Sequence, residues 1–534
     1  MITVNYDIIK QDSFSKKGIF LCLLPIGIIG LLVRMYFEPA TALTGDATNY
    51  FVYAADTGLK GKLSDVYFLG NSGWSLLLSA FFSMTKYDDP LFLMELQRSL
   101  SIFISVVTII PVYFLCRRFF NQSYSLIGAS LFLFQPHIII NSSLGITEPL
   151  FLFLGISSLT LFLNNNHKII YVSFAVAGLF TLIRFEGLLF FAMLSIMFFV
   201  KYRNEKRHFL KYPLVFTIFA LVLLPIAYSN FETHGRDGFT SELFDTGDAS
   251  YQRFIEGKPD IGDPLYGDAS SSNLQNFLTI GIKNMIWFFG VAAIPIFVFF
   301  VPMGIILIIK NKNSLKIDFK IVTVILVSIT MLIPTLYTYG RGSDDVRFLF
   351  MVFPLLVLIS LYGISKLKMK NHHFIMVGIT AAIVLTSFLY LDFKNEIDVD
   401  YENEVFLITQ FIASKTNLIN DNSADIRYRT AATIVTNWPN LPTPTSESHV
   451  ERSLKLISST GHNSLIEFID SSKDKGLTHL AVDGREHQPE FLRDIFYHDE
   501  EYGYLTKILD SKEHDMNYHV KIFKIDYNKI KTYL

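Results

Sequence analysis

Residues 148–203 read EPLFLFLGISSLTLFLNNNHKIIYVSFAVAGLFTLIRFEGLLFFAMLSIMFFVKYR. Three apolar runs alternate here with two short polar breaks, at 164–168 and 184–187. Runs of about 20 apolar residues match the thickness of the hydrocarbon core of a bilayer. The same alternation extends from about residue 18 to residue 392 and then stops. The pattern therefore predicts a membrane protein built from helices.

The composition supports this fold class. Hydrophobic residues make up 51% of the 534-residue chain and charged residues 18%, whereas soluble proteins carry about 25% charged residues. The net charge of -2 excludes a global electrostatic surface for nucleic acid. Both cysteines, Cys22 and Cys116, lie in apolar runs, which argues against a disulfide framework. The first run, 18–37, follows lysines like a signal peptide, but it is long and lacks a small-residue cleavage site, so we interpret it as an uncleaved span.

We predict about 11 transmembrane helices. Their approximate ranges are 18–37, 91–116, 124–141, 148–163, 169–184, 187–200, 213–230, 285–309, 320–338, 347–364 and 374–391. The apolar piece 74–84 is too short to span and is placed at the membrane interface. Lysine and arginine are concentrated in every second break, which predicts a cytoplasmic N-terminus. If 169–184 and 187–200 were one span, every later loop would be assigned to the opposite side of the membrane.

The predicted domains are a transmembrane domain over 1–392, with outer loops 38–90 and 231–284, and a soluble extracytoplasmic α/β domain over 393–534. The odd number of spans places this tail outside the cytoplasm. Within the tail the sequence predicts helices at 404–415 and 464–475, a strand at 477–482, and an antiparallel pair formed by 504–509 and 518–525. We find no catalytic motif there, and the polar residues 483–487 are interpreted as a turn at the end of a strand.

Ionisable residues near membrane depth are candidates for function because burying them in lipid is costly. Asp46 precedes a helical segment and is as readily a helix N-cap as a catalytic group. Glu148 begins a span, where the positive end of a helix stabilises a carboxylate. Arg184 and Glu186 could simply pair with each other, and Arg347 could extend to the interface. Each residue therefore has a structural and a functional interpretation.

The candidates together favour function, since all lie on the predicted outer face. Arg341 accompanies Arg347 in a turn that enters a late span, and His137 lies on the outer half of another. For His137 a hydrogen-bonded buried histidine is favoured over a metal ligand. Guanidinium groups bind phosphate through paired hydrogen bonds, and a neighbouring carboxylate can act as a general base. This grouping suits an anionic, lipid-linked substrate.

In this order the motifs resemble those of the dolichyl-phosphate-mannose protein mannosyltransferase-like glycosyltransferases, which have the glycosyltransferase C fold. The matching positions are Asp46, Tyr50, Ala54 and Gly58 in the first outer loop, the pair Glu148-Pro149, the segment 184–187, and Arg341 with Arg347. The resemblance covers most of residues 18–392 and extends to an α/β domain at the C-terminus. Each motif is weak alone, and the ordered set is more specific.

The sequence departs from the family pattern at two points. The glutamate that usually follows the first aspartate is Ala47 here, so any contact made by that glutamate to a metal or an acceptor is in doubt. The three tryptophans, Trp74, Trp287 and Trp438, are isolated, so there is no Trp-Trp-Asp motif. The missing motif argues against an oligosaccharyltransferase, a related family that carries it.

The resemblance implies inverting transfer of one sugar from a polyprenyl-phosphate donor to an acceptor hydroxyl on a protein, glycan or lipid, as in protein glycosylation and cell-envelope synthesis. It implies Asp46 as the base and Glu148 as a group that orients the acceptor, or that holds a divalent cation, Mg²⁺ or Mn²⁺, with Asp46. The implied contacts to the donor phosphate are Arg347, Arg341 and Arg184. The implied contacts to the acceptor or substrate are Asn49, Tyr50, Glu186 and His137.

Two other classes of protein remain open. One is a secondary transporter or flippase for an anionic lipid or metabolite, and the other is a non-catalytic membrane scaffold. Transporters often contain inverted repeats, and we find no internal repeat in this sequence. A scaffold would have no need of carboxylates and arginines on one outer face.

Overall fold

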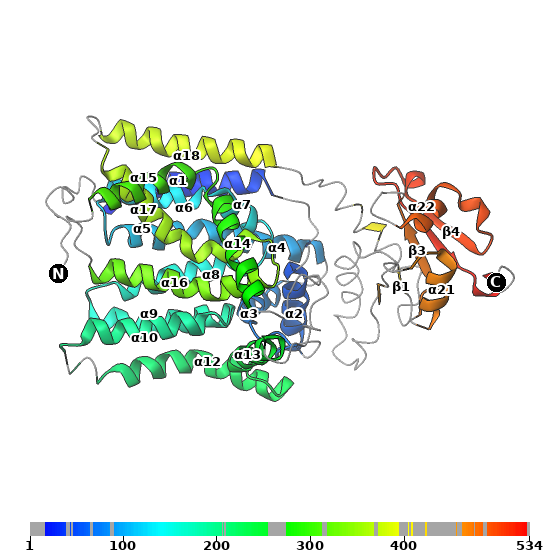
Figure 1. Ribbon diagram of the computed structural model, residues 1–534, viewed down its shortest axis with the longest axis horizontal. Helices are drawn as coiled ribbons and strands as arrows, with labels where there is room; N and C mark the ends of the chain where they lie inside the picture. The colour runs from blue at the N-terminus through cyan, green and yellow to red at the C-terminus, as the bar shows by residue number, and fades with distance from the viewer. Residues whose placement is uncertain are drawn as a thin grey trace. The chain divides into compact units, whose positions relative to one another are not determined.

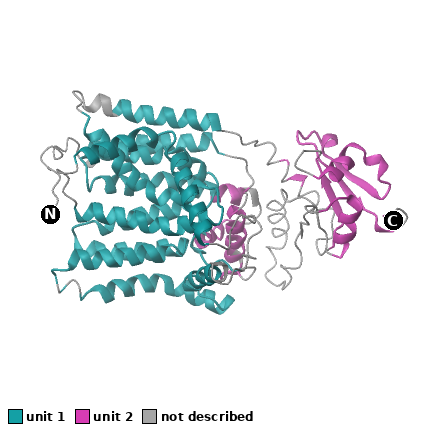
Figure 2. Cartoon of the chain, in the orientation of Figure 1, with its two compact units in different colours: residues 1–38, 68–74, 98–395 teal, residues 39–67, 75–97, 396–534 magenta. Residues whose placement is uncertain are grey.

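The structure is a computed structural model of the full chain (Figure 1). It describes residues 16–38, 43, 46–64, 68–85, 90–205, 207, 210–254, 274–311, 318–367, 372–394, 404, 407–408, 422–423, 455–456, 462–474, 476–483 and 489–530. The chain divides into two compact units (Figure 2): residues 1–38, 68–74 and 98–395 form the first, and residues 39–67, 75–97 and 396–534 form the second.

The first unit is helical. Its helices are α1 (Lys16–Tyr36), the larger part of α4 (Pro90–Val107), α5 (Ile109–Cys116), α6 (Gln122–Leu133), α7 (Pro136–Ser142), α8 (Glu148–Phe162), α9 (His167–Ile183), α10 (Gly187–Tyr202), α12 (Tyr212–His234), α13 (Thr240–Phe254), α14 (Leu274–Ala293), α15 (Phe297–Lys310), α16 (Phe319–Gly340), the 3₁₀ helix η2 (Val346–Val352), α17 (Phe353–Ser365) and α18 (His372–Lys394). Among the described residues, seven helices are long and apolar enough to cross a membrane, or eight if the bent pair α6–α7 is one span. The protein therefore has the helices of a multi-pass membrane protein.

The predicted spans at 148–163, 169–184 and 187–200 coincide with α8, α9 and α10, which are separate helices of 15, 17 and 16 residues. Figure 1 shows them running side by side. They are shorter than the helices that meet the length for a span, so the predicted total of about 11 spans stays a prediction. The break between α9 and α10 is present in the structure.

The prediction of one span over 285–309 is wrong. The chain leaves the helix at residues 294–296, so that α14 ends at Ala293 and α15 begins at Phe297. Pro295 lies in this break, and proline has no N–H with which to continue the helical ladder. The two helices pack against different partners, α14 against α16 and α15 against α17.

The predicted span at 124–141 is also interrupted. Helices α6 and α7 meet at an angle of 55°. Pro136 occupies the first turn of α7, and a proline disfavours helical backbone in the residue before it. Pro136 was therefore the indication of a bend in the sequence, although the residues around it form one continuous apolar run.

Arg34 fixes this bend from α1. Its side chain is fully buried, and it donates hydrogen bonds to the hydroxyls of Ser105 and Ser142 and to the carbonyls of Gly30 and Leu133, at 2.9–3.3 Å. Leu133 ends α6 and Ser142 ends α7. A buried guanidinium is tolerated when its N–H groups are satisfied. Arg34 thus ties α1, α4, α6 and α7 together.

The second unit contains α2 (Asp46–Lys60), most of α3 (Gly73–Phe82) and the C-terminal elements. These are β1 (Asn422–Ser423), β2 (Lys455–Leu456), α21 (Leu465–Lys473), β3 (His479–Val482), α22 (Glu490–Tyr497), η5 (Asp499–Glu501), β4 (Leu505–Asp510), η6 (Ser511–His514), β5 (Lys521–Ile525) and α23 (Tyr527–Ile530). One sheet has the order β3-β5-β4, and both pairings are antiparallel. The predicted pairing of 504–509 with 518–525 is therefore confirmed.

Local sequence explains how several of these C-terminal elements form. Ser464 caps α21 by accepting the N–H of Glu467, and the apolar side of the helix packs with β3 and β5 residues around Phe468 and Phe523. Gly476 has φ +87°, a left-handed conformation that favours glycine, at the turn into β3. The predicted helix at 404–415 and the predicted turn at 483–487 lie mostly outside the described residues.

Candidate active site

Glu148 is the first residue of α8, and its side chain is only 4% exposed. Pro149 follows it in the first helical turn, where a proline is well accommodated. The Thr147 hydroxyl donates to Glu148 Oε2 at 3.2 Å. The partial positive charge at the start of the helix favours the carboxylate at this position. The α8 N-terminus therefore presents a buried, oriented carboxylate.

Arg184 contacts this carboxylate from the turn between α9 and α10. Its backbone leaves the helix for an extended conformation, φ −152° and ψ 133°. The guanidinium donates from Nη1 to Glu148 Oε1 at 3.0 Å, and from Nε and Nη2 to Glu186 Oε1 at 3.1 and 2.7 Å. Gly187 closes the turn so tightly that a Cβ there would lie 2.5 Å from Thr181. The residue pattern of 184–187 is thus explained by one compact turn.

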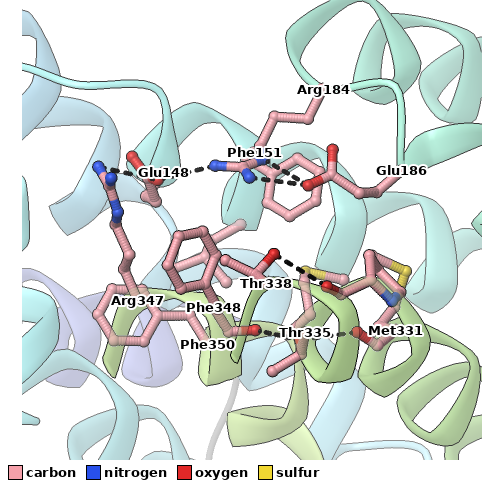
Figure 3. A pocket seen from close by; sticks show the side chains of 13 residues that line it. Glu148, Phe151, Arg184, Glu186, Met331, Thr335, Thr338, Arg347, Phe348 and Phe350 are labelled. Atoms are coloured by element: carbon pink, nitrogen blue, oxygen red, sulfur yellow. Dashed lines mark hydrogen bonds and ion pairs between the residues drawn. The ribbon is translucent and has the colours of Figure 1, made fainter. Parts of the chain in front are cut away.

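Arg347 approaches Glu148 from the opposite side (Figure 3). Asp345 caps η2 by accepting the Arg347 backbone N–H at 2.9 Å, and its Oδ2 lies 3.0 Å from Arg347 Nε. Arg347 Nη1 lies 3.8 Å from Glu148 Oε1, an ion-pair distance. The same carboxylate oxygen therefore faces two guanidinium groups.

A pocket opens beside this cluster, with an empty volume of about 420 Å³ including its solvent-open mouth. Its lining consists of Glu148, Phe151, Leu152, Arg184, Glu186, Met331, Pro334, Thr335, Thr338, Arg347, Phe348, Phe350 and Met351. The Arg184 guanidinium contacts two aromatic rings, 5.6 Å from the Phe151 centroid and 5.9 Å from that of Phe348. A mostly apolar pocket with a few convergent charged groups is the usual form of a ligand site.

Residues 68–74 support both turns that carry these charges. Trp74 Nε1 donates to the carbonyl of Gly145 at 3.1 Å, three residues before Glu148. A Cβ on Gly73 would lie 2.6 Å from the carbonyl oxygen of Leu182, two residues before Arg184. This close contact requires glycine at residue 73. Gly73 and Trp74 therefore contact both turns, the one before α8 and the one after α9.

The other predicted site residues lie elsewhere. Arg341 follows the C-terminus of α16 and does not line the pocket. The half-buried His137 donates a hydrogen bond from Nε2–H to the Val291 carbonyl at 3.1 Å. Asp46, Asn49 and Tyr50 belong to α2 in the second unit, where Asp46 and Asn49 are exposed.

The residues of the cluster do not suit a divalent cation. Among the described residues there is no group of three or more His, Cys, Asp or Glu side chains that could hold a metal ion. Glu148 Oε1 already faces Arg184 at 3.0 Å and Arg347 at 3.8 Å, and two guanidinium charges disfavour a third positive charge at the same oxygen. We therefore derive no chemical step through a metal at Glu148.

No protein-family profile and no curated protein matches this chain. Solved structures do match. ArnT from Cupriavidus metallidurans bound to undecaprenyl phosphate aligns with a TM-score of 0.57 at 9% identity, over 96% of this chain and 98% of that chain. The chain has the glycosyltransferase C fold.

Two structures of an Archaeoglobus fulgidus oligosaccharyltransferase share this fold. The complex with zinc and sulfate has a TM-score of 0.54 at 13% identity and covers 87% of this chain and 68% of that chain. The AglB complex with an inhibitory peptide and a dolichol-phosphate has a TM-score of 0.52 at 11% identity, over 86% and 69%. The predicted glycosyltransferase C fold is thereby confirmed, and the mannosyltransferase-like subfamily stays a prediction.

Within this fold, sequence reasoning missed the groups that surround the charged residues. Asp345 was one of several polar residues in its turn, and its position two residues before Arg347 was the available signal for a capping aspartate. Phe151 and Phe348 flank Arg184. Nothing in the sequence distinguished these two rings among the 50 phenylalanines.

Proposed function

We propose that this protein is a membrane glycosyltransferase that moves a single sugar from a polyprenyl-phosphate donor to an acceptor hydroxyl, with inversion at the anomeric carbon. One observation carries the proposal: a buried carboxylate, Glu148, faces two guanidinium groups in a pocket of a glycosyltransferase C fold. The two neighbours with bound lipid contain undecaprenyl phosphate or a dolichol-phosphate. That chemistry suits a pocket containing arginines.

Arg347 is the proposed contact to the donor phosphate. All three guanidinium nitrogens of Arg184 donate to Glu148 or Glu186, so its role is to hold the two carboxylates in place. Arg347 is anchored at Nε by Asp345, and its Nη1 is 3.8 Å from Glu148. A fixed guanidinium stabilises the charge that grows on the leaving phosphate, the kind of electrostatic effect that often dominates catalysis.

In the proposed step, the acceptor oxygen attacks the anomeric carbon as the bond from that carbon to the phosphate oxygen breaks. The Asp46 carboxylate takes the acceptor proton, which typically contributes about 10²–10⁴-fold. The electron pair of the broken bond stays on the polyprenyl phosphate, whose added negative charge Arg347 stabilises. Glu148 keeps Arg347 oriented and balances its charge before the donor binds. The step needs no further reactant.

The same proposal gives the orientation in the membrane. The distribution of lysine and arginine among the loops favours a cytoplasmic N-terminus, with the pocket and residues 393–534 on the outer face. The donor would then be a lipid whose sugar already faces outward. The partners implied are the polyprenyl-phosphate donor, the acceptor and the bilayer.

The test compares Asp46→Asn and Arg347→Met with wild type in liposomes that contain a radiolabelled polyprenyl-phosphate sugar. We expect Asp46→Asn to lower kcat by at least about 100-fold with little change in donor affinity. Arg347→Met should weaken binding of the donor as well as slow transfer. Arg236→Met, at an exposed ion pair with Asp245, is the matched control. Full transfer by Asp46→Asn, or unchanged donor binding by Arg347→Met, would remove that residue from the mechanism.

A further inference from the structure

Glu186 has an unusual carboxylate. The residue is 8% exposed and lines the pocket. Its Oε1 receives both hydrogen bonds from Arg184, as the dashed lines in Figure 3 show. Its Oε2 is buried and accepts no hydrogen bond from any residue that the structure describes. By contrast, both oxygens of Glu148 have partners: Oε1 accepts from Arg184 and Oε2 from Thr147.

The fold itself does not account for this oxygen. Glu186 precedes α10, but its side chain makes no capping hydrogen bond. The first N–H groups of α10 are already used, since Gly187 donates to the Arg184 carbonyl and Leu188 to the Phe185 carbonyl. A buried polar atom without a partner is uncommon in native proteins and is often found at functional sites. The unsatisfied oxygen therefore points to a hydrogen-bond donor on a ligand.

We propose that Glu186 Oε2 accepts a hydrogen bond from a hydroxyl group of the donor sugar and so determines which sugar is recognised. This inference rests on the proposed function. A carboxylate repels phosphate, so Oε2 is unsuited to the lipid phosphate itself. It is suited to an O–H donor, and a charged acceptor makes such a bond stronger.

The order of groups along the cluster supports this assignment. Figure 3 shows Arg347, Glu148, Arg184 and Glu186 following one another along one side of the pocket. If the donor phosphate lies at Arg347, the sugar attached to it extends along the pocket toward Glu186. Phe151 and Phe348 provide apolar surface beside Arg184 for the ring of the sugar. Glu186 therefore acts in recognition of the sugar, while Arg347 and Asp46 act in the transfer.

The test separates the sugar from the lipid phosphate. Binding to the full-length protein in nanodiscs is measured for undecaprenyl phosphate, for its glucose, galactose and mannose conjugates, and for the four monodeoxy analogues of whichever conjugate binds most tightly. Wild type and Glu186→Gln are compared. We expect Glu186→Gln to weaken the tightest conjugate about 5- to 10-fold, because the amide oxygen still accepts the hydroxyl but without the contribution of the charge. Affinity for undecaprenyl phosphate alone should stay within about twofold.

The analogues then identify the hydroxyl. One deoxy position should weaken binding to wild type about 10- to 100-fold, the size of a hydrogen bond to a charged group. Glu186→Gln, whose neutral amide oxygen accepts the same hydroxyl more weakly, should discriminate less than wild type between that analogue and the parent conjugate. Glu148→Gln removes the same charge from the same cluster and is the matched control. It should weaken all the conjugates alike and leave the ratio of parent to analogue as in wild type.

Two results would overturn the proposed role of Glu186 in sugar recognition. One is that no conjugate binds more tightly than undecaprenyl phosphate. The other is that Glu186→Gln discriminates among the deoxy analogues as strongly as wild type does. If Glu186→Gln does not fold, wild type alone decides, because equal binding of all four analogues would contradict a buried hydroxyl contact. Sugar transfer is measured separately. Binding that depends on Glu186 without any transfer would overturn the proposed function and leave the recognition site in place.

Discussion

Replacing Arg184 with methionine removes a guanidinium that bonds both Glu148 and Glu186, while it keeps an apolar side chain beside Phe151 and Phe348. The three ionic side chains are 19%, 4% and 11% exposed, so solvent screens the loss only weakly. Removing one partner from a buried ion pair typically costs about 3–5 kcal/mol, because the remaining charge stays buried without compensation. Arg184→Met should lose a free energy of unfolding of this size.

The structure also predicts which charge causes the loss. Glu148 keeps Arg347 at 3.8 Å, whereas among the described residues Arg184 donates the only hydrogen bonds to the Glu186 carboxylate. Adding Glu186→Gln to Arg184→Met should therefore recover part of the lost stability, about 1–3 kcal/mol. Adding Glu148→Gln should recover less.

The assay is equilibrium unfolding of the purified full-length chain in mixed micelles of increasing sodium dodecyl sulfate content, followed by circular dichroism. The control is Arg236→Met. Arg236 pairs with Asp245 at 2.9 Å, but the two side chains are 55% and 58% exposed, and exposed pairs contribute about 0–1 kcal/mol. If Arg184→Met and Arg236→Met lose the same stability, burial does not set the strength of the cluster and the reasoning is refuted.

Three further predictions concern the segments around the site. Trp74→Phe removes the N–H that bonds the Gly145 carbonyl. Because an unsatisfied buried carbonyl costs about 1–3 kcal/mol, this variant should lower kcat about 10-fold. Its KM should stay within twofold of wild type, as measured by steady-state sugar transfer. Gly73→Ala places a Cβ 2.6 Å from a backbone oxygen of α9 and should lower the free energy of unfolding by about 1–3 kcal/mol. Gly247→Ala, in α13, is the control, because a Cβ there meets no atom within 4 Å and should not destabilise the fold. Burial raises the pKa of Asp237, but hydrogen bonds from the start of α13 outweigh it and lower this pKa from 3.8 to about 2. The turn before α13 should therefore be stabilised above pH about 4 and lose that protection as pH falls toward 2. The protection of the α13 amides against hydrogen exchange should fall over this pH range in wild type. In Asp237→Asn that fall in protection should be absent.

Local patterns in the sequence were enough to select Glu148, Arg184 and Glu186 as candidates. Glu148 beside Pro149 is a helix start, and 184–187 is a tight break between two apolar runs, so both predictions needed only neighbouring residues. Counting spans then placed both at the same membrane face, since each follows an outward-running helix. The structure brings Glu148, Arg184, Glu186 and Arg347 together in one pocket. The chemical roles of these residues stay predictions.

Features that depend on three-dimensional packing could not be predicted in this way. Hydropathy joined α14 to α15 across Pro295 because the whole run is apolar, and hydropathy does not register a missing N–H. The buried position of Arg34 was equally hidden, because its partners come from α4, α6 and α7, distant in the sequence. The base assigned to Asp46 rests on the family resemblance, since the structure describes Asp46 in α2 of the second unit.

The most direct test of the account is to follow both products of one reaction. Purified protein in liposomes receives a radiolabelled undecaprenyl-phosphate sugar and an extract of envelope proteins, glycans and lipids as acceptors. The account predicts that labelled sugar moves to an acceptor and that one undecaprenyl phosphate is released for each sugar transferred, with little product from Glu148→Gln. Movement of the intact lipid-linked sugar between leaflets, without any release of undecaprenyl phosphate, would contradict it and identify a flippase.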